Sequence, residues 1–354
     1  MTARERVLAA LQHKQTDKVP FSLGFGINDY AKKELAEYLK LSAEELEKLL
    51  ARVSDVRHVA PRYIGPQDRR VVRDGREIDE WGVWRKKVYN GYDTYKEIEI
   101  YPLKGLSSMQ ELEEYRFPSP DWFDYSVLPA EIEAACGEEE HAVILAAGNL
   151  FETSWYLAGF EDMLALLLLD PELAGALMEK VTDFFIGYTE RALTAAGGRI
   201  DIAFTADDIG QQDGLLMSLP VWKEVIQPQH KRLNKKLHEM GVKVMYHTDG
   251  AIMDAVDGLV EMGVDILEAL QFDARGMDSR KLKENWGDRL CFHGGVSVQS
   301  TLPFGTPEDV RREVEERVRV LGCNGGYILA PSHAIQGGTP PENIVAFLEA
   351  AQRI

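Results

Sequence analysis

One pattern repeats along this sequence: a short apolar run is followed by a longer stretch with helical periodicity. We count eight such runs: VPFSLGF (19–25), VRHVAPRY (56–63), AVILAAG (142–148), IDIAFTA (200–206), KVMYH (243–247), DILEAL (265–270), LCFHGGV (290–296) and GYILAPS (326–332). Apolar runs of this length, each followed by a helical stretch, predict strands that alternate with helices. Eight strand–helix units in one undivided chain are typical of an α/β fold of the (β/α)8 TIM-barrel type.

The helical stretches are clearest in the second half of the chain. They cover residues 219–241, 251–263, 306–322 and 340–352. In the third stretch, Thr306 is a predicted N-cap, Pro307 takes the first helical position and Gly322 follows the end. The alternative is an open doubly wound sheet, which the sequence disfavours because no GxGxxG motif opens a helix after the first run.

An irregular stretch between the second and third runs interrupts the repeat. Residues 74–103 contain alternating, strand-like segments and a predicted turn at Asn90-Gly91. We interpret this stretch as a β-hairpin excursion that covers part of the barrel mouth. An N-terminal helical segment is also predicted, and no linker divides the chain, so we expect residues 1–354 to form one domain. The side chains of Trp81, Trp84 and Trp155 are expected to pack in the core or a lid.

Composition excludes several classes of function. The 354 residues are 45% hydrophobic, which is enough for a large core. A formal charge of -18 predicts no binding to nucleic acid or to anionic membranes. The N-terminus lacks the apolar core of a signal peptide, and the longest apolar run, around 163–169, is too short to span a bilayer. Three scattered cysteines, Cys136, Cys291 and Cys323, fit a reducing compartment, so we expect a cytoplasmic protein.

Polar side chains gather where the later runs end. They are Asp207 and Asp208 after the fourth run, His247 and Asp249 at the fifth, Glu268 in the sixth, His293 in the seventh and His333 after the eighth. In a TIM barrel the active site lies at the carboxyl ends of the strands. His247, Asp249, Glu268 and His333 could therefore meet on one side of the mouth and bind zinc, since catalytic zinc sites use about three protein ligands and keep one position open.

Each of these residues also has a simpler interpretation. A histidine at a strand end can bond a backbone carbonyl, and His293 can orient a neighbouring ligand. Asp207 and Asp208 can supply a catalytic base or bind a cationic group, but either can instead cap the next helix.

The whole chain resembles the uroporphyrinogen decarboxylase superfamily. The stretches that carry the resemblance are RVLAALQHKQTDKVP, SDVRHVAPRYIG, DEWGV, ADDIGQQDGLLMS, HTDG, GVDIL, FHGGVSVQSTLPFGTPEDVRREV and GGYILAPSHAIQGGTPPENI. The resemblance implies a (β/α)8 barrel. The superfamily includes porphyrinogen decarboxylases and zinc-dependent methyltransferases that work with corrinoid proteins.

The decarboxylase branch fits the N-terminal segment poorly. True decarboxylases carry an arginine-rich segment there that clamps the carboxylates of the substrate, and this chain has VPFSLGFGINDYAKK instead. Asp55 could match the central aspartate of those enzymes. A decarboxylase-like lyase stays an alternative, as does a non-catalytic protein that binds a tetrapyrrole or another small molecule.

The methyltransferase branch is more similar. Its zinc ligands, a His-x-Cys motif, an acidic residue and a second cysteine, fall on His247-Thr248-Asp249, Glu268 and His333. Asp249 and His333 thus replace both cysteines of the family pattern. The resemblance implies Zn²⁺ as the cofactor, with nitrogen and oxygen ligands in place of thiolates; the alternative is a site that has lost the metal and carries out other chemistry.

This change of ligands favours a different substrate. Imidazole and carboxylate ligands suit a harder metal site than thiolates do, and such a site would polarise an oxygen atom. We therefore expect demethylation of a small O-methyl or N-methyl compound, with Asp208 or His293 acting as the general acid or base for the departing atom. The chain has no Asp-x-His-x-x-Gly signature, so the methyl acceptor would be a separate corrinoid protein. Association into a homodimer stays open.

Overall fold

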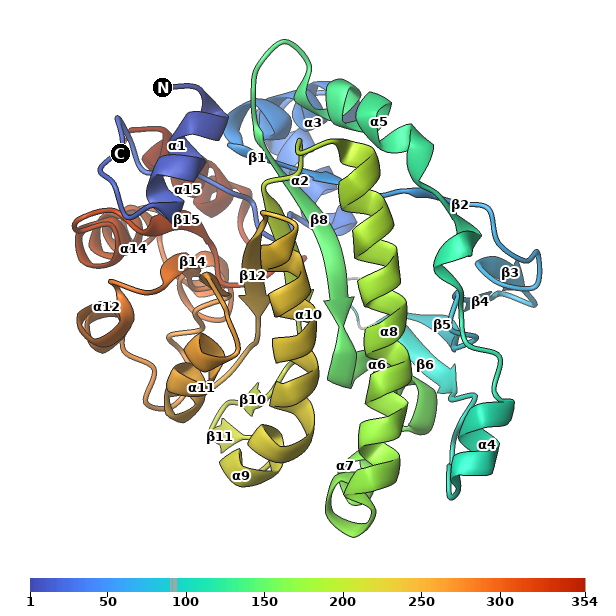
Figure 1. The fold of residues 1–354 in the computed structure, drawn as a ribbon. Coiled ribbons are helices and arrows are strands. Elements are labelled where there is room, and N and C mark those ends of the chain that lie inside the picture. Colours follow the sequence, from blue (N-terminus) through green and yellow to red (C-terminus); the bar gives the residue numbers. More distant parts are fainter. Residues whose placement is uncertain (90, 92–93, 354) are drawn as a thin grey trace.

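Seven parallel strands form one curved sheet at the centre of the molecule (Figure 1). The computed structural model describes residues 1–89, 91 and 94–353, and the strand count refers to these residues. The strands, in their order across the sheet, are β1 (Val56–Val59), β8 (Ala142–Asn149), β9 (Ile202–Ala206), β12 (Lys243–His247), β13 (Ile266–Glu268), β14 (Cys291–Val296) and β15 (Tyr327–Pro331). Seven of the eight predicted runs supply them, which confirms the TIM-barrel type of α/β fold.

The first predicted strand, residues 19–25, is reduced to a single β-bridge. Phe21 pairs in parallel with Leu329 of β15. Its carbonyl oxygen also accepts a hydrogen bond of 2.8 Å from the backbone nitrogen of Asp55, next to the start of β1. The segment thus lies between the two edges of the sheet without forming a regular strand. Two residues limit the length over which this segment can pair: Pro20 has no N–H to donate, and Gly24 has a φ of +55° that turns the chain away from β15.

Alternate residues of each strand point into the barrel. In β12, Met245 belongs to an inner apolar cluster, whereas Val244 and Tyr246 pack outward against the helices. The inner cluster also includes Val7, Ala10 and Leu11 of helix α1 (Ala3–Leu11), which therefore plugs the amino end of the barrel. The period of two along the strand places His247 inside, two residues beyond Met245, at the opposite and open end.

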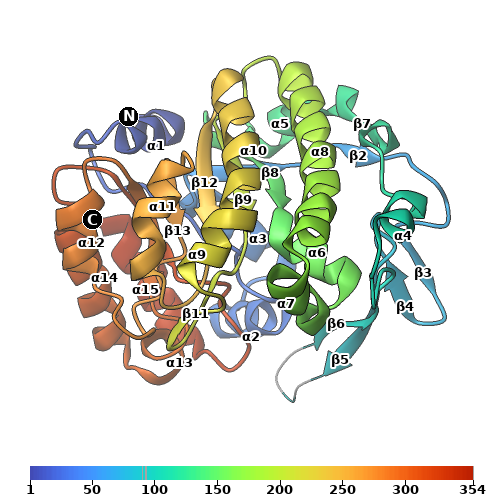
Figure 2. The same cartoon turned by 60° about the horizontal axis from the view of Figure 1, so that its bottom comes forward.

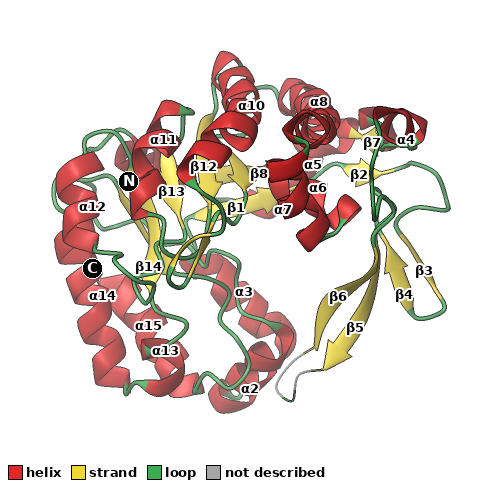
Figure 3. Cartoon of the chain, turned by 90° about the horizontal axis from the view of Figure 1, so that it is seen from below, coloured by secondary structure: helices red, strands yellow, loops and turns green. Residues whose placement is uncertain are grey.

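Helices surround the sheet (Figures 1 and 3). Their bounds are α2 (Asp29–Leu39), α3 (Ala43–Val53), α4 (Met109–Glu114), α5 (Leu128–Cys136), α6 (Leu150–Ala158), α7 (Phe160–Leu169), α8 (Pro171–Ala196), α9 (Leu219–Val221), α10 (Gln227–Glu239), α11 (Val256–Glu261), α12 (Ser279–Trp286), α13 (Thr301–Phe304), α14 (Pro307–Leu321) and α15 (Pro341–Arg353). Thr306 caps α14 as predicted, in a capping box with Asp309. No helix among the described residues is both long enough and apolar enough to cross a membrane.

The predicted excursion is larger than one hairpin. It is a four-stranded antiparallel sheet that stands beside the barrel (Figures 2 and 3). Its strands are β3 (Val71–Arg73), β4 (Arg76–Ile78), β5 (Trp84–Tyr89) and β6 (Thr94–Ile100). Asn90 of the predicted turn lies outside the described residues. Trp81 is buried against Phe184 and Phe185 of α8, as expected for a packing residue.

Short strands complete the chain. The second predicted run, residues 56–63, divides into β1 and β2 (Arg62–Tyr63), and β2 pairs with β7 (Phe123–Asp124). A small hairpin of β10 (Gly210–Gln211) and β11 (Gly214–Leu215) follows Asp207 and Asp208 at the barrel mouth.

Candidate active site

Strand register places His247, Glu268 and His293 at the same level of the barrel interior. His247 of β12 pairs with Glu268 of β13. Ile266 of β13 pairs with Cys291 of β14, so Glu268 lies level with His293, two residues further along both strands. All three side chains are buried. The histidine that ends KVMYH therefore faces the barrel interior beside a carboxylate of the next strand.

Glu268 holds the ring of His247 in one orientation. Its Oε2 atom lies 2.5 Å from Nδ1 of His247, while Nε2 of that ring is 3.7 Å from Oδ1 of Asp208. Burial by itself would lower the pKa of His247, but the charge and hydrogen bond of Glu268 outweigh burial and raise the pKa to about 9. A carboxylate that fixes one imidazole nitrogen leaves the other free to bind a metal.

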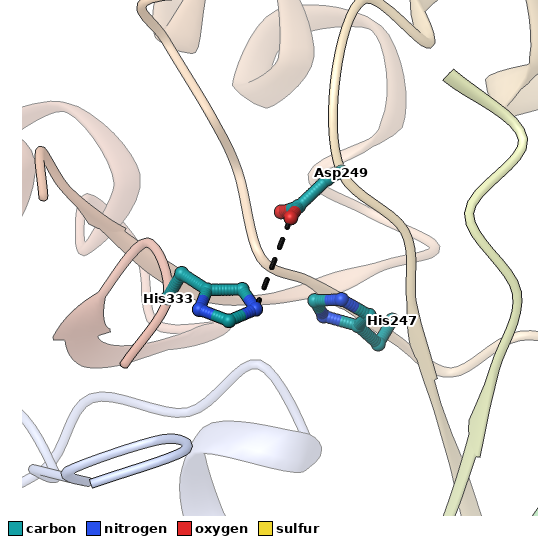
Figure 4. Close-up of side chains that lie close together, drawn as sticks. All are labelled: His247, Asp249 and His333. Atoms are coloured by element: carbon teal, nitrogen blue, oxygen red, sulfur yellow. Dashed lines mark ion pairs between the residues drawn. The ribbon is translucent and has the colours of Figure 1, made fainter. Parts of the chain in front are cut away.

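His247, Asp249 and His333 converge at the barrel mouth (Figure 4). One ligand atom from each lies within 4.8 Å of the other two, and Nε2 of His333 is 4.0 Å from Oδ2 of Asp249. Two imidazoles and a carboxylate are donors that zinc accepts. The donor types and their convergence therefore fit a divalent metal such as zinc.

Glu268, the remaining predicted ligand, lies outside this group of three. It contacts the Nδ1 side of His247, and its other oxygen, Oε1, is 3.8 Å from Nδ1 of His293. The geometry resembles that of a carboxylate that orients a metal-binding histidine from behind.

The two adjacent aspartates have different surroundings. The buried carboxylate of Asp207 accepts hydrogen bonds of 2.8 Å from the backbone nitrogens of Phe151 and Glu152, and it also contacts His230. Asp207 thus caps the start of α6, which is the simpler role considered for it, and it is not among the described residues that line the mouth cavity. Asp208 does line the mouth cavity, together with His247 and His333.

The mouth cavity is about 560 Å³, a size that suits a small molecule. Phe25 packs over the site, with its ring 4.7 Å from that of His247 and 4.9 Å from that of His333. The additional sheet contributes Arg85, and α6 contributes Glu152.

Glu152 is a candidate that the sequence analysis missed. Burial, followed by the charge of Asp207, raises the pKa of Glu152 to about 7. A carboxyl group with a pKa near 7 can donate or accept a proton at neutral pH. Its position in the first turn of the helix after the third predicted strand was the available signal, because that turn also lies at the barrel mouth.

His293 lies deeper than the three converging residues. Burial lowers its pKa to about 4, so its ring is neutral at pH 7. It lines an inner cavity of about 330 Å³ together with Glu268 and His58. A neutral ring can accept or donate a hydrogen bond, but a pKa of about 4 makes it a poor proton donor at neutral pH.

Comparisons with known proteins agree with the fold. The family described as Uroporphyrinogen decarboxylase (URO-D) matches residues 105–354. The methylated-thiol–coenzyme M methyltransferase of Methanosarcina mazei is 28% identical over 202 residues, which are 57% of this chain and 50% of that protein. The chloroplastic uroporphyrinogen decarboxylase 2 of Oryza sativa subsp. japonica is 23% identical over 261 residues, or 72% of this chain and 63% of that protein.

A solved structure extends the likeness to the whole fold. The methyltransferase from Methanosarcina mazei superposes with a TM-score of 0.72 at 19% identity, covering 100% of this chain and 99% of that one. In sequence, the chain spans only half to two thirds of the two relatives named above. The family match covers well over half of the chain. The chain therefore belongs to the uroporphyrinogen decarboxylase family.

Proposed function

We propose that this protein is a zinc-dependent methyltransferase that removes the methyl group from a small O-methyl or N-methyl compound and passes it to a separate corrinoid protein. The observation that carries the proposal is the convergence of His247, Asp249 and His333 at the barrel mouth, where the two histidines line the mouth cavity. The similarity to a methyltransferase of the same family supports the type of reaction.

The proposed reaction breaks the bond between the methyl carbon and the heteroatom. The electron pair of that bond would stay on the departing heteroatom, and a reduced corrinoid bound to the partner protein would supply the electron pair for the new bond to the methyl carbon. A zinc ion held by His247, Asp249 and His333 would act as a Lewis acid that stabilises the charge left on the departing atom.

The protein itself supplies orientation and a proton. Glu268 holds His247 with Nε2 directed to the mouth, and Phe25 limits the movement of both histidine rings. Asp208 and Glu152 both line the mouth cavity, where either carboxyl group can exchange a proton with the departing oxygen or nitrogen. Glu152 suits proton donation because its pKa is about 7.

Recognition of a substrate with many carboxylates is poorly supported. Two arginines line the mouth cavity, but Nε of Arg70 lies 3.4 Å from Glu80, and Arg85 is paired with Asp79. Their charges are already balanced, so they do not form the free clamp that a porphyrinogen would need.

Metal content and methyl transfer test the proposal together. The purified protein should contain close to one equivalent of zinc, and it should remove the methyl group of an aromatic methyl ether when a reduced corrinoid protein is present. His333→Ala should lower both zinc content and transfer, because it removes a ligand. His238→Ala, which removes a half-exposed histidine paired with Asp265, is the matched control and should change neither.

One result would overturn the proposal. A metal-free protein that is unaffected by added zinc and still converts its substrate would show that the converging residues are not a metal site. Release of CO2 from a carboxylated substrate by that metal-free protein would identify the lyase alternative.

A further inference from the structure

The barrel interior holds a second cavity beneath the converging residues. Its volume is about 330 Å³. The apolar part of its wall consists of Phe25, Ile144, Ala146, Phe204 and Met245. A dry cavity of roughly 150 Å³ lined by apolar side chains already holds a benzene molecule. The inner cavity therefore has room for one substituted six-membered ring.

The polar side of this cavity contains an imidazole without partners. His293 is only 2% exposed, and neither ring nitrogen has a hydrogen-bond partner among the described residues. Its closest charged neighbour is Glu268, whose Oε1 lies 3.8 Å from Nδ1, beyond hydrogen-bond distance. Buried polar atoms in proteins are nearly always hydrogen-bonded, so this ring is arranged for a partner that enters the cavity.

The cavity disfavours a negatively charged ligand. No lysine or arginine is found among the described residues that line it, and its one carboxylate, Glu268, is hydrogen-bonded to His247. An anion would have to leave water, and the described part of the cavity wall has no lysine or arginine to balance its charge, while His247 is already paired with Glu268; this is costly in a buried site.

The inner cavity and the mouth cavity share walls. Phe25, Ala146 and Phe204 line both. Phe25 also contacts the rings of His247 and His333. A molecule with its ring in the inner cavity could therefore extend a substituent toward the converging residues.

We infer that the inner cavity binds the body of an uncharged, ring-sized and largely apolar substrate, with an oxygen of that substrate hydrogen-bonded to His293. The inference rests on the proposed function only in assuming that this substrate carries a methyl group. Binding of the ring in the inner cavity does not depend on methyl transfer. His293 is then a specificity residue that selects neutral, hydroxyl-bearing compounds, and the wall around Glu268 rejects their carboxylated analogues.

Three probes of similar size test the inference by calorimetry on the full-length protein. Phenol should bind about tenfold more tightly than toluene, because only phenol can bond to His293. Benzoate should bind at least 100-fold more weakly than phenol. His293→Phe keeps a ring in place but removes both nitrogens, so it should abolish the preference for phenol over toluene. His293→Gln keeps a donor and an acceptor and should retain part of that preference.

Ala146→Leu tests whether the ligand occupies the inner cavity, and His238→Phe serves as the control. The larger side chain at position 146 fills part of the cavity and should weaken both phenol and toluene at least tenfold, while the surface change at position 238 should alter neither. Binding of benzoate as tight as that of phenol, or a phenol preference that survives in His293→Phe, would overturn the inference. Because these measurements need neither zinc nor a corrinoid protein, their outcome is separate from that of the methyl-transfer assay.

Discussion

At the scale of single residues, the polar side chains at the strand ends divide into two groups. One group converges at the barrel mouth or lines its cavity and consists of His247, Asp249, His333 and Asp208. Asp207, in contrast, caps the start of α6. The same residue type, one position apart, therefore lies in two different surroundings, because successive residues after a strand point in different directions.

The His247–Glu268 pair makes the stability of the metal-free protein depend on pH. His247 has a folded pKa of about 9, above its ordinary value of 6.5, so its stabilising contribution is complete below about pH 6.5 and is lost as pH rises through 9. Between pH 7 and 10 this group should remove roughly 2–3 kcal/mol from the free energy of unfolding. Urea denaturation curves, recorded across this pH range with a chelator present to remove metal, measure this loss. Glu268→Gln should flatten this part of the profile, and an unchanged slope in that variant would contradict the assignment.

Asp207 and Asp208 should respond differently to the same substitution. Asp207→Asn weakens a buried helix cap and its contact with His230, so it should lower the free energy of unfolding by about 2 kcal/mol and leave zinc content unchanged. Asp208→Asn should lower methyl transfer with little effect on stability, because its side chain is 41% exposed. Denaturation curves, metal content and turnover of the two variants distinguish these roles. Loss of turnover without loss of stability in Asp207→Asn would restore a catalytic function to that residue.

At the scale of elements, the path of β14 depends on a glycine inside the strand. Gly294 has a φ of +114°, and a Cβ atom there would lie 2.1 Å from the carbonyl oxygen of Ala269. The close approach lets β14 lie against the chain after β13, and this keeps His293 level with Glu268. The His-Gly-Gly sequence is therefore a packing requirement of the site.

Replacement of Gly294 by alanine should be strongly destabilising. A Cβ overlapping a backbone oxygen cannot be relieved by a side-chain rotation, so we expect a loss of about 3 kcal/mol or more and disturbed binding at His293. Gly175→Ala is the matched control. This glycine lies inside α8 and has an ordinary φ, and a methyl group there would meet no other part of the described chain within 4 Å, so the change should stabilise the protein by about 0.5–1 kcal/mol. Equal effects of the two substitutions would contradict this account.

At the scale of the whole molecule, we propose that the additional sheet and the barrel form one domain. Trp81, between β4 and β5, is buried against Phe184 and Phe185 of the long helix α8. Val83 also belongs to the main apolar cluster of the barrel, and Ile78 at the end of β4 is buried. The sheet is thus attached to the barrel through its core and not through a linker.

The two parts should consequently unfold in the same transition. Tryptophan fluorescence and far-ultraviolet circular dichroism should give coincident denaturation curves. Trp81→Ala should lower the free energy of unfolding by about 3–5 kcal/mol, because it leaves a large cavity between the sheet and α8. A first transition that removes only β-structure and leaves the barrel intact would show that the sheet is an independent unit.

Local signals in the sequence are sufficient for the class of fold, because strand–helix alternation, apolar periodicity and helix caps depend on residues close together in the chain. These signals predicted all seven strands of the central parallel sheet, the cap at Thr306 and the polar residues at the strand ends. They also indicated an inserted β-region, although its four strands exceed the one predicted hairpin.

The arrangement of those polar residues, in contrast, depends on tertiary contacts. Inter-strand register placed Glu268 on Nδ1 of His247. The first turn of α6 lies next to the end of β9, where Asp207 caps it and Glu152 lines the mouth cavity. Closure of the sheet reduced residues 19–25 to a bridge and left Phe25 over the two histidines. These outcomes depend on contacts between residues far apart in the chain, and no local pattern specifies the distance or the ring nitrogen involved.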